Sequence, residues 1–158
     1  MISVMFVCHG NICRSPMAEY IFKHLASRSS FGSRFSCASC ATSSEEIFRG
    51  VGNPIYPPAA AELARRGIPF EQRRAVQLTK ADYDKFDLFV GMDRANVRNM
   101  HRIFGGDPED KIRMLGDFSG LGEVSDPWYS GDFCRAYCDI LSGCEALLQA
   151  LTEEGEEI

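Results

Sequence analysis

The first part of the chain combines an apolar run with a helical pattern. The segment from Ile2 to Val7 is almost entirely apolar and rich in β-branched side chains, as in a strand buried on both faces of a parallel sheet. After Ser15 and Pro16, apolar residues recur at three- and four-residue steps as far as Leu25. This spacing predicts a helix with Ser15 as its cap and Pro16 in its first turn. The order is therefore strand, tight loop, helix.

The alternation of strand and helix continues along the chain. Hydrophobic periods and capping residues predict three more strands, over residues 34–41, 88–92 and 111–115, and three more helices, over 58–66, 93–104 and 133–151. The segment 116–131 is predicted to be a long loop, and loops of this length tend to be functional. Because alternating strands and helices imply right-handed crossovers, we expect one α/β domain over residues 1–158, with a four-stranded parallel sheet flanked by helices.

Length and charge narrow the function classes. A chain of 158 residues with 45% hydrophobic and 25% charged residues has the size and composition of one globular domain. Its net charge of -5 argues against a general nucleic-acid or anionic-membrane binder, because such proteins need a basic excess. No stretch is long enough to span a bilayer, and the N-terminal apolar run is too short for a secretory signal. We therefore expect a cytoplasmic protein, in which the reducing compartment favours free thiols over a disulfide framework for the seven cysteines.

The strongest chemical signal lies where the first strand meets the first helix. Five residues separate Cys8 from Arg14, namely His9, Gly10, Asn11, Ile12 and Cys13. Gly10 and Asn11 tolerate left-handed backbone, which lets successive N–H groups turn inward around an anion. The helix N-terminus adds the positive end of its dipole, and Arg14 adds a bidentate guanidinium. This loop is predicted to bind a tetrahedral dianion.

Cys8 is expected at the floor of this anion-binding loop. The helix dipole, the inward N–H groups and Arg14 all favour its thiolate, which is the nucleophilic form of cysteine. Ser15 is placed to donate its hydroxyl to the sulfur, and Asp126, in the long loop, is the candidate acid for a leaving group. A lone cysteine after an apolar run would suit core packing. Packing does not require the whole combination of strand, Cys8, five-residue loop, Arg-Ser-Pro and helix, which predicts nucleophilic catalysis on phosphorus.

Two motifs resemble those of the low-molecular-weight protein tyrosine phosphatases. The first is the loop segment VCHGNICRSP, and the second is the Asp-Pro-aromatic-aromatic segment from Asp126 to Tyr129. Four shorter motifs also fall in the family's order and approximate spacing, namely Ala41-Thr42-Ser43, Gly52-Asn53-Pro54, Gly67-Ile68-Pro69 and Met92-Asp93. The resemblance covers essentially the whole chain.

The resemblance implies hydrolysis of phosphotyrosine, in proteins or as small aryl phosphates, through a cysteinyl phosphate and without a metal or cofactor. It implies Cys8 as nucleophile, Arg14 as transition-state binder, and Asp126 as acid and then base. The substrate-binding residues implied are His9, Gly10, Asn11, Ile12, Cys13, Ser15, Trp128 and Tyr129, with Ser39 among the partners that hold the loop. The fold implied is flavodoxin-like, of the phosphatase-I type, in agreement with the periodicity. The sequence does not indicate an oligomeric state.

Three positions depart from the family's pattern. His9 stands where an apolar or small residue is more common, and we interpret it as a solvent-facing loop residue, with stabilisation of the Cys8 thiolate as the alternative. Arg66 stands where a histidine often precedes Gly-Ile-Pro, so the network that supports the loop is expected to differ. Glu45 and Glu46 replace an aromatic residue at the pocket mouth. They predict an acidic rim and weaker turnover of phosphopeptides with acidic flanks than with basic flanks.

Three other functions compete with this one. Arsenate reductases share the fold and loop but also require two cysteines in a mid-chain segment, and residues 41–133 contain none. Phosphoarginine phosphatases carry threonine at the position of Ile12 and lack the aromatic pair after Asp-Pro. A catalytically idle phosphoprotein-binding module has nothing in its favour, since the catalytic set is complete. Phosphotyrosine is the substrate that the sequence favours.

A metal-binding or redox module is a further alternative, based on the spacing of Cys37, Cys40, Cys134, Cys138 and Cys144. Odd spacing on a strand places Cys37 and Cys40 on opposite faces. Cys134 and Cys138 are expected to extend the apolar side of the last helix. Core packing is therefore the preferred interpretation for these cysteines.

The sequence leaves the role of Cys13 undecided and assigns no role to four basic residues. Cys13 is either a small buried loop residue or the partner of Cys8 in a reversible, protective disulfide. The pair Arg73-Arg74, like His24 and His101, is assigned no role in the site.

Overall fold

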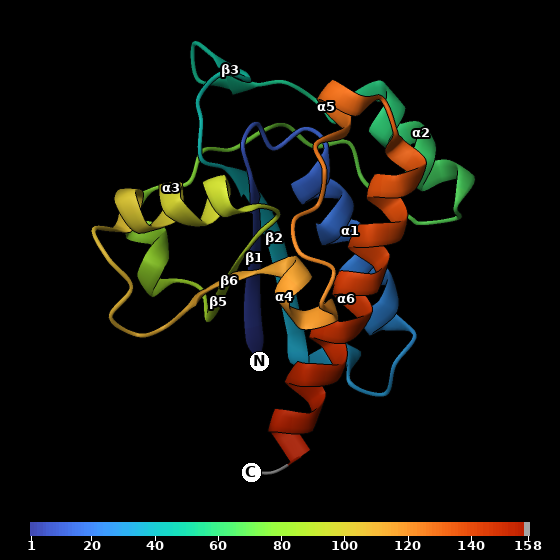
Figure 1. Cartoon of the computed structure of the whole chain (residues 1–158), viewed down its shortest axis with the longest axis vertical. Helices are drawn as coiled ribbons and strands as arrows, with labels where there is room; N and C mark the ends of the chain where they lie inside the picture. Colours follow the sequence, from blue (N-terminus) through green and yellow to red (C-terminus); the bar gives the residue numbers. More distant parts are fainter. Residues whose placement is uncertain (157–158) are drawn as a thin grey trace.

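The molecule is built on a four-stranded parallel sheet with the strand order β2-β1-β5-β6 (Figure 1). The computed structural model describes residues 1–156, with side chains as far as Glu153. The strands are β1 (Ile2–Cys8), β2 (Phe35–Ala41), β5 (Leu88–Gly91) and β6 (Ile112–Met114). Since β1 pairs with both β2 and β5, the predicted central parallel strand is confirmed.

Helices cover both faces of this sheet (Figure 1). The helices are α1 (Arg14–Ser27), α2 (Pro57–Arg65), α3 (Arg94–Phe104), α4 (Leu115–Ser119), α5 (Pro127–Ser130) and α6 (Phe133–Glu156). Two 3-10 helices are η1 (Gly32–Arg34) and η2 (Lys80–Asp84). One core joins the sheet to α1, α2, α4 and α6, and the other joins it to α3 and η2. The predicted α/β architecture is therefore confirmed.

Strand β1 contributes to both cores, which explains its unbroken apolar sequence. Val4 and Phe6 lie in the core beneath α1 and α6, whereas Met5 and Val7 lie in the core beneath α3. Successive side chains of a strand point to opposite faces. All four of these side chains are nearly or fully buried. The strand is thereby anchored on both sides, and its carboxyl end at Cys8 is a rigid platform.

The structure contains short elements that the hydrophobic pattern did not predict. A two-stranded antiparallel hairpin, β3 (Ile47–Phe48) and β4 (Val51–Gly52), lies between β2 and α2. The segment 116–131, predicted to be one long loop, contains most of α4 and all of α5. These elements are too short for a hydrophobic period to show. The α5 turn nevertheless carries recognisable signals, because Asp126 caps it, Pro127 opens it and Gly131 ends it at a positive φ of 72°.

The prediction that Ser15 caps the first helix is wrong. Helix α1 begins at Arg14, and Cys13 occupies the capping position without a side-chain hydrogen bond. The Ser15 hydroxyl turns back toward Cys8. The error has a physical reason, since the short side-chain oxygen that makes serine a good cap also suits it to hydrogen-bond another nearby group.

The cysteines follow the predictions in part. All seven are free thiols. Cys37 packs toward the α1 and α6 side of the sheet and Cys40 toward the α3 side, so they cannot share one metal ion. Burial raises the pKa of Cys37 to about 12. The prediction that Cys134 and Cys138 extend an apolar helix face is wrong, because both are exposed.

Residues 1–156 include no helix that is long and apolar enough to cross a membrane.

A glycine substitution tests how closely α4 packs against α6. Gly143 lies inside α6, where alanine is intrinsically more favourable by about 0.5–1 kcal/mol. A Cβ at this position would lie 2.5 Å from Cγ of Leu115, which is fully buried. We expect Gly143→Ala to lower the free energy of unfolding by about 1–3 kcal/mol, because overpacking outweighs helix propensity. Denaturant titration measures this, with exposed Glu145→Ala as control. A free energy at or above the wild-type value would contradict the packing.

Candidate active site

The predicted anion-binding loop lies at the carboxyl end of β1, between that strand and α1. Backbone hydrogen bonds tie it to neighbouring segments, since Thr42 N donates to Cys8 O and Tyr56 N donates to Ile12 O. Asn11 adopts a left-handed conformation with φ of 59°, which is the turn that brings successive N–H groups to one side. Cys8 is only 3% exposed. The sulfur therefore lies at the floor of a curled loop, as predicted.

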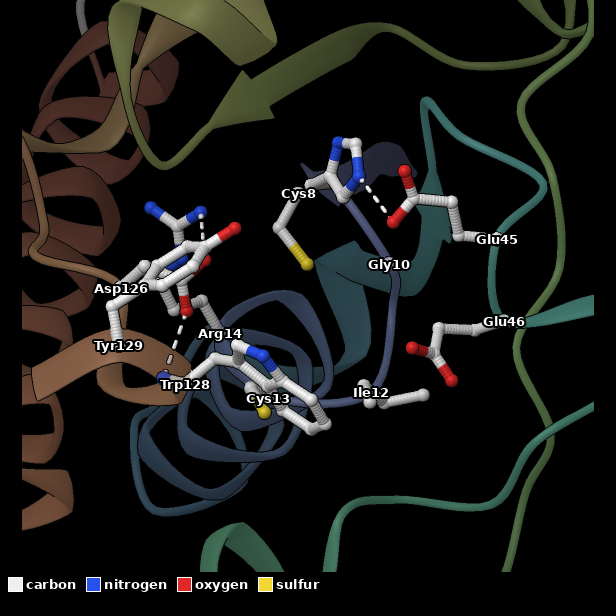
Figure 2. Close-up of a pocket in the computed structure, with 11 residues that line it drawn as sticks. Cys8, Gly10, Ile12, Cys13, Arg14, Glu45, Glu46, Asp126, Trp128 and Tyr129 are labelled. Atoms are coloured by element: carbon white, nitrogen blue, oxygen red, sulfur yellow. Dashed lines mark hydrogen bonds and ion pairs between the residues drawn. The ribbon is translucent and has the colours of Figure 1, made fainter. Parts of the chain in front are cut away.

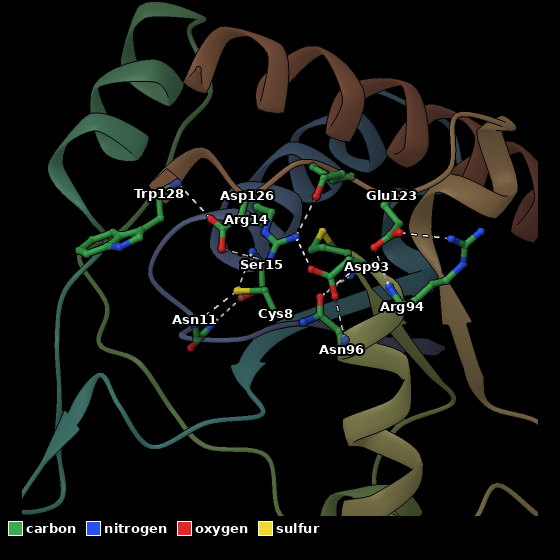
Figure 3. A network of polar contacts seen from close by, with 12 residues as sticks. Cys8, Asn11, Arg14, Ser15, Asp93, Arg94, Asn96, Glu123, Asp126 and Trp128 are labelled. Atoms are coloured by element: carbon green, nitrogen blue, oxygen red, sulfur yellow. Dashed lines mark hydrogen bonds and ion pairs between the residues drawn. The ribbon is translucent and has the colours of Figure 1, made fainter. Parts of the chain in front are cut away.

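Three donors surround the Cys8 sulfur (Figure 3). The backbone N–H groups of Asn11 and Ser15 donate to Sγ over 3.3 and 3.4 Å. The Ser15 hydroxyl lies 2.9 Å from the same sulfur. A sulfur that accepts several hydrogen bonds beside a helix N-terminus is favoured as a thiolate.

The surrounding hydrogen bonds decide which way the Ser15 hydroxyl points. Oδ1 of Asn11 accepts from Nη2 of Arg73 at 2.6 Å and from Val76 N at 3.1 Å. The amide orientation is thereby fixed, and Nδ2 of Asn11 donates to Oγ of Ser15 at 2.8 Å. Because Ser15 Oγ accepts this bond, its own hydrogen is available for the Cys8 sulfur, the nearest acceptor. Ser15 therefore acts as hydrogen-bond donor to the Cys8 sulfur.

Arg73 belongs to the support of the loop, so the prediction that it has no role in the site is wrong. Besides Asn11 Oδ1, its guanidinium donates to Asn11 O at 3.3 Å and to Ser39 O at 3.2 Å. Its Nε lies 3.9 Å from Oε1 of buried Glu19, which also accepts from Ser39 Oγ at 2.6 Å. Ser39, expected to hold the loop, thus acts through Glu19 and Arg73. Arg73 lies in an irregular segment, where no hydrophobic period or cap gives a signal.

Arg14 is anchored on one side by groups from two other segments. Nη1 donates to Oδ2 of Asp93 and to Val124 O, both at 2.8 Å. Asp93 uses its other oxygen, Oδ1, to cap α3 through Asn96 N at 2.8 Å. Burial by itself lowers the pKa of Arg14, but the nearby negative charges of Cys8, Asp126 and Asp93 outweigh it and raise the pKa. The guanidinium stays charged and fixed beside the loop.

Asp93 was predicted only as the start of the helix over residues 93–104 and as part of the Met92-Asp93 motif, and its contact with Arg14 was not foreseen. One signal for it was available. Asp93 follows closely on β5, the strand beside β1, and the carboxyl ends of parallel strands meet at the same edge of a sheet. The contact with Val124 had no such signal, because a main-chain carbonyl carries no sequence information.

Asp126 enters the pocket from the turn of α5. Its Oδ1 accepts from Trp128 N at 3.0 Å, and its Oδ2 lies 3.4 Å from Nη2 of Arg14. The Trp128 ring packs against Tyr56, with ring centroids 4.7 Å apart. Tyr129 is 86% exposed. The carboxylate and the two aromatic side chains therefore reach the pocket on one short helical turn.

These residues line one pocket (Figure 2). Its lining consists of Cys8, His9, Gly10, Ile12, Cys13, Arg14, Glu45, Glu46, Asp126, Trp128 and Tyr129. Of the predicted site residues, only Asn11 and Ser15 are outside this lining, and both are buried behind the loop. His9 is half-exposed and its Nε2 lies 3.0 Å from Oε2 of Glu45. The structure thus brings the predicted residues together.

Cys13, the second cysteine of the loop, is buried and lines the same pocket as Cys8. Burial, together with the negative charge of Cys8, raises the pKa of the Cys13 thiol. Cys13 is therefore a neutral thiol, in contrast to the donor-rich environment of Cys8.

Arg66 does not take part in the site. Its guanidinium lies over the ring of Tyr137 and donates to the Cys134 sulfur at 3.1 Å, near the start of α6. The network that supports the loop runs through Arg73 instead. Within residues 1–156, no group of three or more His, Cys, Asp or Glu side chains is arranged to hold a metal ion.

The arrangement is suited to nucleophilic attack on a bound tetrahedral anion. Backbone donors and the α1 N-terminus supply positive potential around one centre. The Cys8 sulfur lies at the floor of the pocket, the Arg14 guanidinium beside it and the Asp126 carboxyl group at its wall. These are the parts required for covalent catalysis with an anionic transition state.

Comparisons with known proteins agree with this chemistry. The sequence profile of the family described as "Low molecular weight phosphotyrosine protein phosphatase" matches residues 3–157. The low molecular weight protein-tyrosine-phosphatase YfkJ of Bacillus subtilis is 38% identical over 157 residues, covering 98% of each chain. Its crystal structure superposes with a TM-score of 0.88, at 37% identity over 98% of this chain and 96% of that one.

Two further relatives widen the comparison. The human low molecular weight phosphotyrosine protein phosphatase is 35% identical and covers 93% of this chain and 94% of its own. A Drosophila arginine phosphatase structure has a TM-score of 0.80 at 28% identity, over 94% of this chain and 96% of that one. The fold alone therefore does not separate these substrates, and the pocket residues must.

The role of Arg73 is tested through the reactivity of Cys8. Without Arg73 the Asn11 Oδ1 keeps only Val76 N as donor, so the Asn11 amide is held less firmly and Ser15 is less constrained to donate to the sulfur. We expect Arg73→Ala to slow alkylation of Cys8 by iodoacetate about tenfold, as for loss of a hydrogen bond to a charged group. Mass spectrometry of the Cys8 peptide measures the rate.

The neighbouring arginine supplies a matched control. Arg74 donates to Gly52 O at 3.0 Å and does not contact the loop. Arg74→Ala should leave the alkylation rate of Cys8 unchanged, and Arg73→Lys should give an intermediate rate. Equal rates for Arg73→Ala and Arg74→Ala would contradict the supporting role.

Proposed function

The chain belongs to the low molecular weight phosphotyrosine protein phosphatase family and is a protein-tyrosine phosphatase, and we propose that Cys8, Arg14 and Asp126 carry its chemistry. The observation that carries the proposal is the Cys8 sulfur, which has three hydrogen-bond donors around it at the floor of a pocket. Arg14 and Asp126 line the same pocket. The three side chains are thus within reach of one bound phosphate.

In the first half-reaction, the Cys8 thiolate attacks phosphorus. The S–P bond forms while the P–O bond to the aromatic ring breaks. Arg14 and the loop N–H groups stabilise the phosphate oxygens in the transition state. Asp126, in its protonated form, gives its proton to the departing phenolate oxygen. The result is a free phenol and a phosphocysteine.

In the second half-reaction, water attacks the phosphocysteine. The Asp126 carboxylate takes a proton from this water as the new P–O bond forms. The S–P bond breaks, and the sulfur leaves as a thiolate that the Ser15 hydroxyl stabilises. Inorganic phosphate departs and the starting enzyme is restored. The proposed steps use neither a metal ion nor an organic cofactor.

We propose a phosphorylated aromatic ring as substrate, in phosphotyrosine proteins or in small aryl phosphates. Ile12, Trp128 and Tyr129 give the pocket apolar walls that suit a flat ring. The Ile12 side chain has no polar group to accept a hydrogen bond from the guanidinium of phosphoarginine. Arsenate reduction would need a relay of further thiols, and among the described residues Cys8 and Cys13 are the cysteines of the pocket.

We also propose that residues 1–158 act as one domain in the cytoplasm, without nucleic-acid or membrane partners. A reducing compartment keeps a thiolate nucleophile active. The net charge of -5 supports the absence of nucleic-acid binding.

Hydrolysis of aryl phosphates at mildly acidic pH, with a chelator present, tests the catalytic roles. We expect wild-type turnover to persist with the chelator. Cys8→Ser should abolish it, because a serine hydroxyl is not ionised under these conditions. Asp126→Asn should lower kcat by about 10²–10⁴-fold, most strongly for the most basic phenol leaving groups.

A second aspartate gives the matched control. Asp132 lies outside the pocket lining and caps the start of α6 through Arg135 N at 2.9 Å. Asparagine caps a helix about as well as aspartate, so Asp132→Asn should keep the wild-type kcat. No turnover by fully reduced wild type would overturn the proposal. An Asp126→Asn effect that is the same for every leaving group would overturn the role of Asp126.

The open alternative for Cys13 gives a further prediction. Peroxide converts the Cys8 thiolate to a sulfenic acid, and attack by the Cys13 thiol then forms a disulfide and releases water. Both cysteines line the pocket. We expect peroxide-inactivated wild type to regain activity with dithiothreitol, and Cys13→Ser to regain much less, since Cys8 proceeds to irreversible acids. Equal recovery in both proteins would contradict the disulfide.

A further inference from the structure

The pocket has an acidic wall opposite the proposed acid and aromatic side chains. Figure 2 shows Glu45 and Glu46 on the side of the pocket away from Asp126, Trp128 and Tyr129. Both glutamates lie between β2 and β3, directly before the hairpin. A peptide whose phosphotyrosine enters this pocket must pass its neighbouring residues along this wall.

Glu46 makes two hydrogen bonds with Asn53 and lies against Gly10 of the loop. Its Oε2 accepts from Nδ2 of Asn53 at 2.7 Å, and its main-chain oxygen accepts from Asn53 N at 2.7 Å. Its Cγ is so close to Gly10 that a Cβ added there would lie 3.0 Å away. Glu46 is also half-buried. The carboxylate is therefore restrained by its bond to Asn53 before substrate arrives, which reduces the side-chain entropy lost when it pairs with a ligand.

The two glutamates differ in how their charges are balanced. Glu45 is exposed, and its Oε2 lies 3.0 Å from Nε2 of His9. Glu46 makes no ion pair with any of the side chains described up to residue 153, and its hydrogen-bond partner Asn53 is neutral. Arg14, the permanent cation of the lining, already faces Asp93 and Asp126. The charge of Glu46 is thus left without a counter-ion at the mouth of the pocket.

We propose that Glu46 is a specificity-determining residue that selects phosphotyrosine with a lysine or arginine beside it in the peptide. An ammonium or guanidinium group next to the phosphotyrosine supplies the missing counter-charge, whereas an acidic neighbour is repelled. The inference rests on the proposed function, because anchoring of the phosphate over Cys8 is what brings the neighbouring residues to Glu46. It assigns the charge preference expected from the sequence mainly to one side chain.

The test compares two phosphotyrosine peptides that differ only in having arginine or glutamate on both sides of the phosphotyrosine. The readout is the ratio of kcat/KM for the arginine peptide to that for the glutamate peptide. We expect a ratio of about three- to tenfold for wild type at low salt, from one partly exposed charge contact. Salt at 0.5 M should reduce this ratio, since the screening length becomes about 4 Å.

Three variants test whether the preference for the arginine peptide depends on Glu46. Glu46→Gln keeps the size of the side chain and its acceptor oxygen for Asn53, and should bring the ratio below about twofold. Glu46→Lys should favour the glutamate peptide. Glu145→Gln makes the same change in net charge at an exposed position of α6 outside the pocket lining, and should keep the wild-type ratio.

The outcomes separate this inference from the function on which it rests. If wild type hydrolyses phenyl phosphate but shows a ratio near one, or if Glu46→Gln keeps the wild-type ratio, the inference is overturned and the function stands. If Glu45→Gln abolishes the preference and Glu46→Gln does not, the assignment to Glu46 is wrong. If fully reduced wild type does not hydrolyse phenyl phosphate, the proposed function fails and the inference fails with it.

Discussion

The hydrogen bonds to the buried Cys8 sulfur are the interaction on which the rest of the site depends. A negative charge on a sulfur that is almost fully removed from solvent is costly unless donors and a counter-charge compensate it. Asn11 and Ser15 provide the donors, and Arg14 provides the counter-charge. Each of these groups has its own support, from Arg73 behind Asn11 and from Asp93 beside Arg14. Asn11 and Arg14 are therefore each held in place by a second residue that lies further from the sulfur (Figure 3).

The sheet explains how distant segments meet at this sulfur. Strands β1 and β5 run parallel and adjacent, so Cys8 and Asp93 come to the same edge although they are far apart in sequence. The segment that carries Asp126 crosses the same edge and leads into α6 (Figure 1). Parallel topology thus gathers the Cys8 sulfur, the Arg14 guanidinium with its partner Asp93, and the Asp126 carboxyl group at one place, as expected for the carboxyl edge of an open α/β sheet.

The sequence predicted the parts of the site that lie within one local pattern. Cys8 and Arg14 share a single loop between a strand and a helix, so their spacing alone fixed their relation. The nearly unbroken apolar run of β1 likewise predicted a strand buried on both faces. Asp126 was identified through its motif and a family resemblance, because no local spacing links it to Cys8.

The parts that were missed depend on contacts between segments that lack a regular period. Arg73 reaches Asn11 from an irregular stretch, and Val124 contributes only a carbonyl oxygen. Ser15 was misread as a cap because its oxygen is suited to both tasks. Cys134 and Cys138 were misplaced because the helical spacing does not by itself say which side of α6 faces the sheet.

The turn of α5 links recognition to chemistry. Asp126 caps this turn by accepting from the main chain of Trp128, and the Trp128 ring rests on Tyr56. Asp126, the proposed proton donor, and the aromatic wall of Trp128 and Tyr129 are therefore carried by a single short helix. Any sequence change that shifts this wall to admit a different ring also displaces the Asp126 carboxyl group from its place beside Arg14. Substitutions in the α5 turn therefore change substrate range and catalytic rate at the same time. A new specificity is more readily acquired on the opposite wall, formed by Glu45 and Glu46, because neither residue takes part in the proposed reaction.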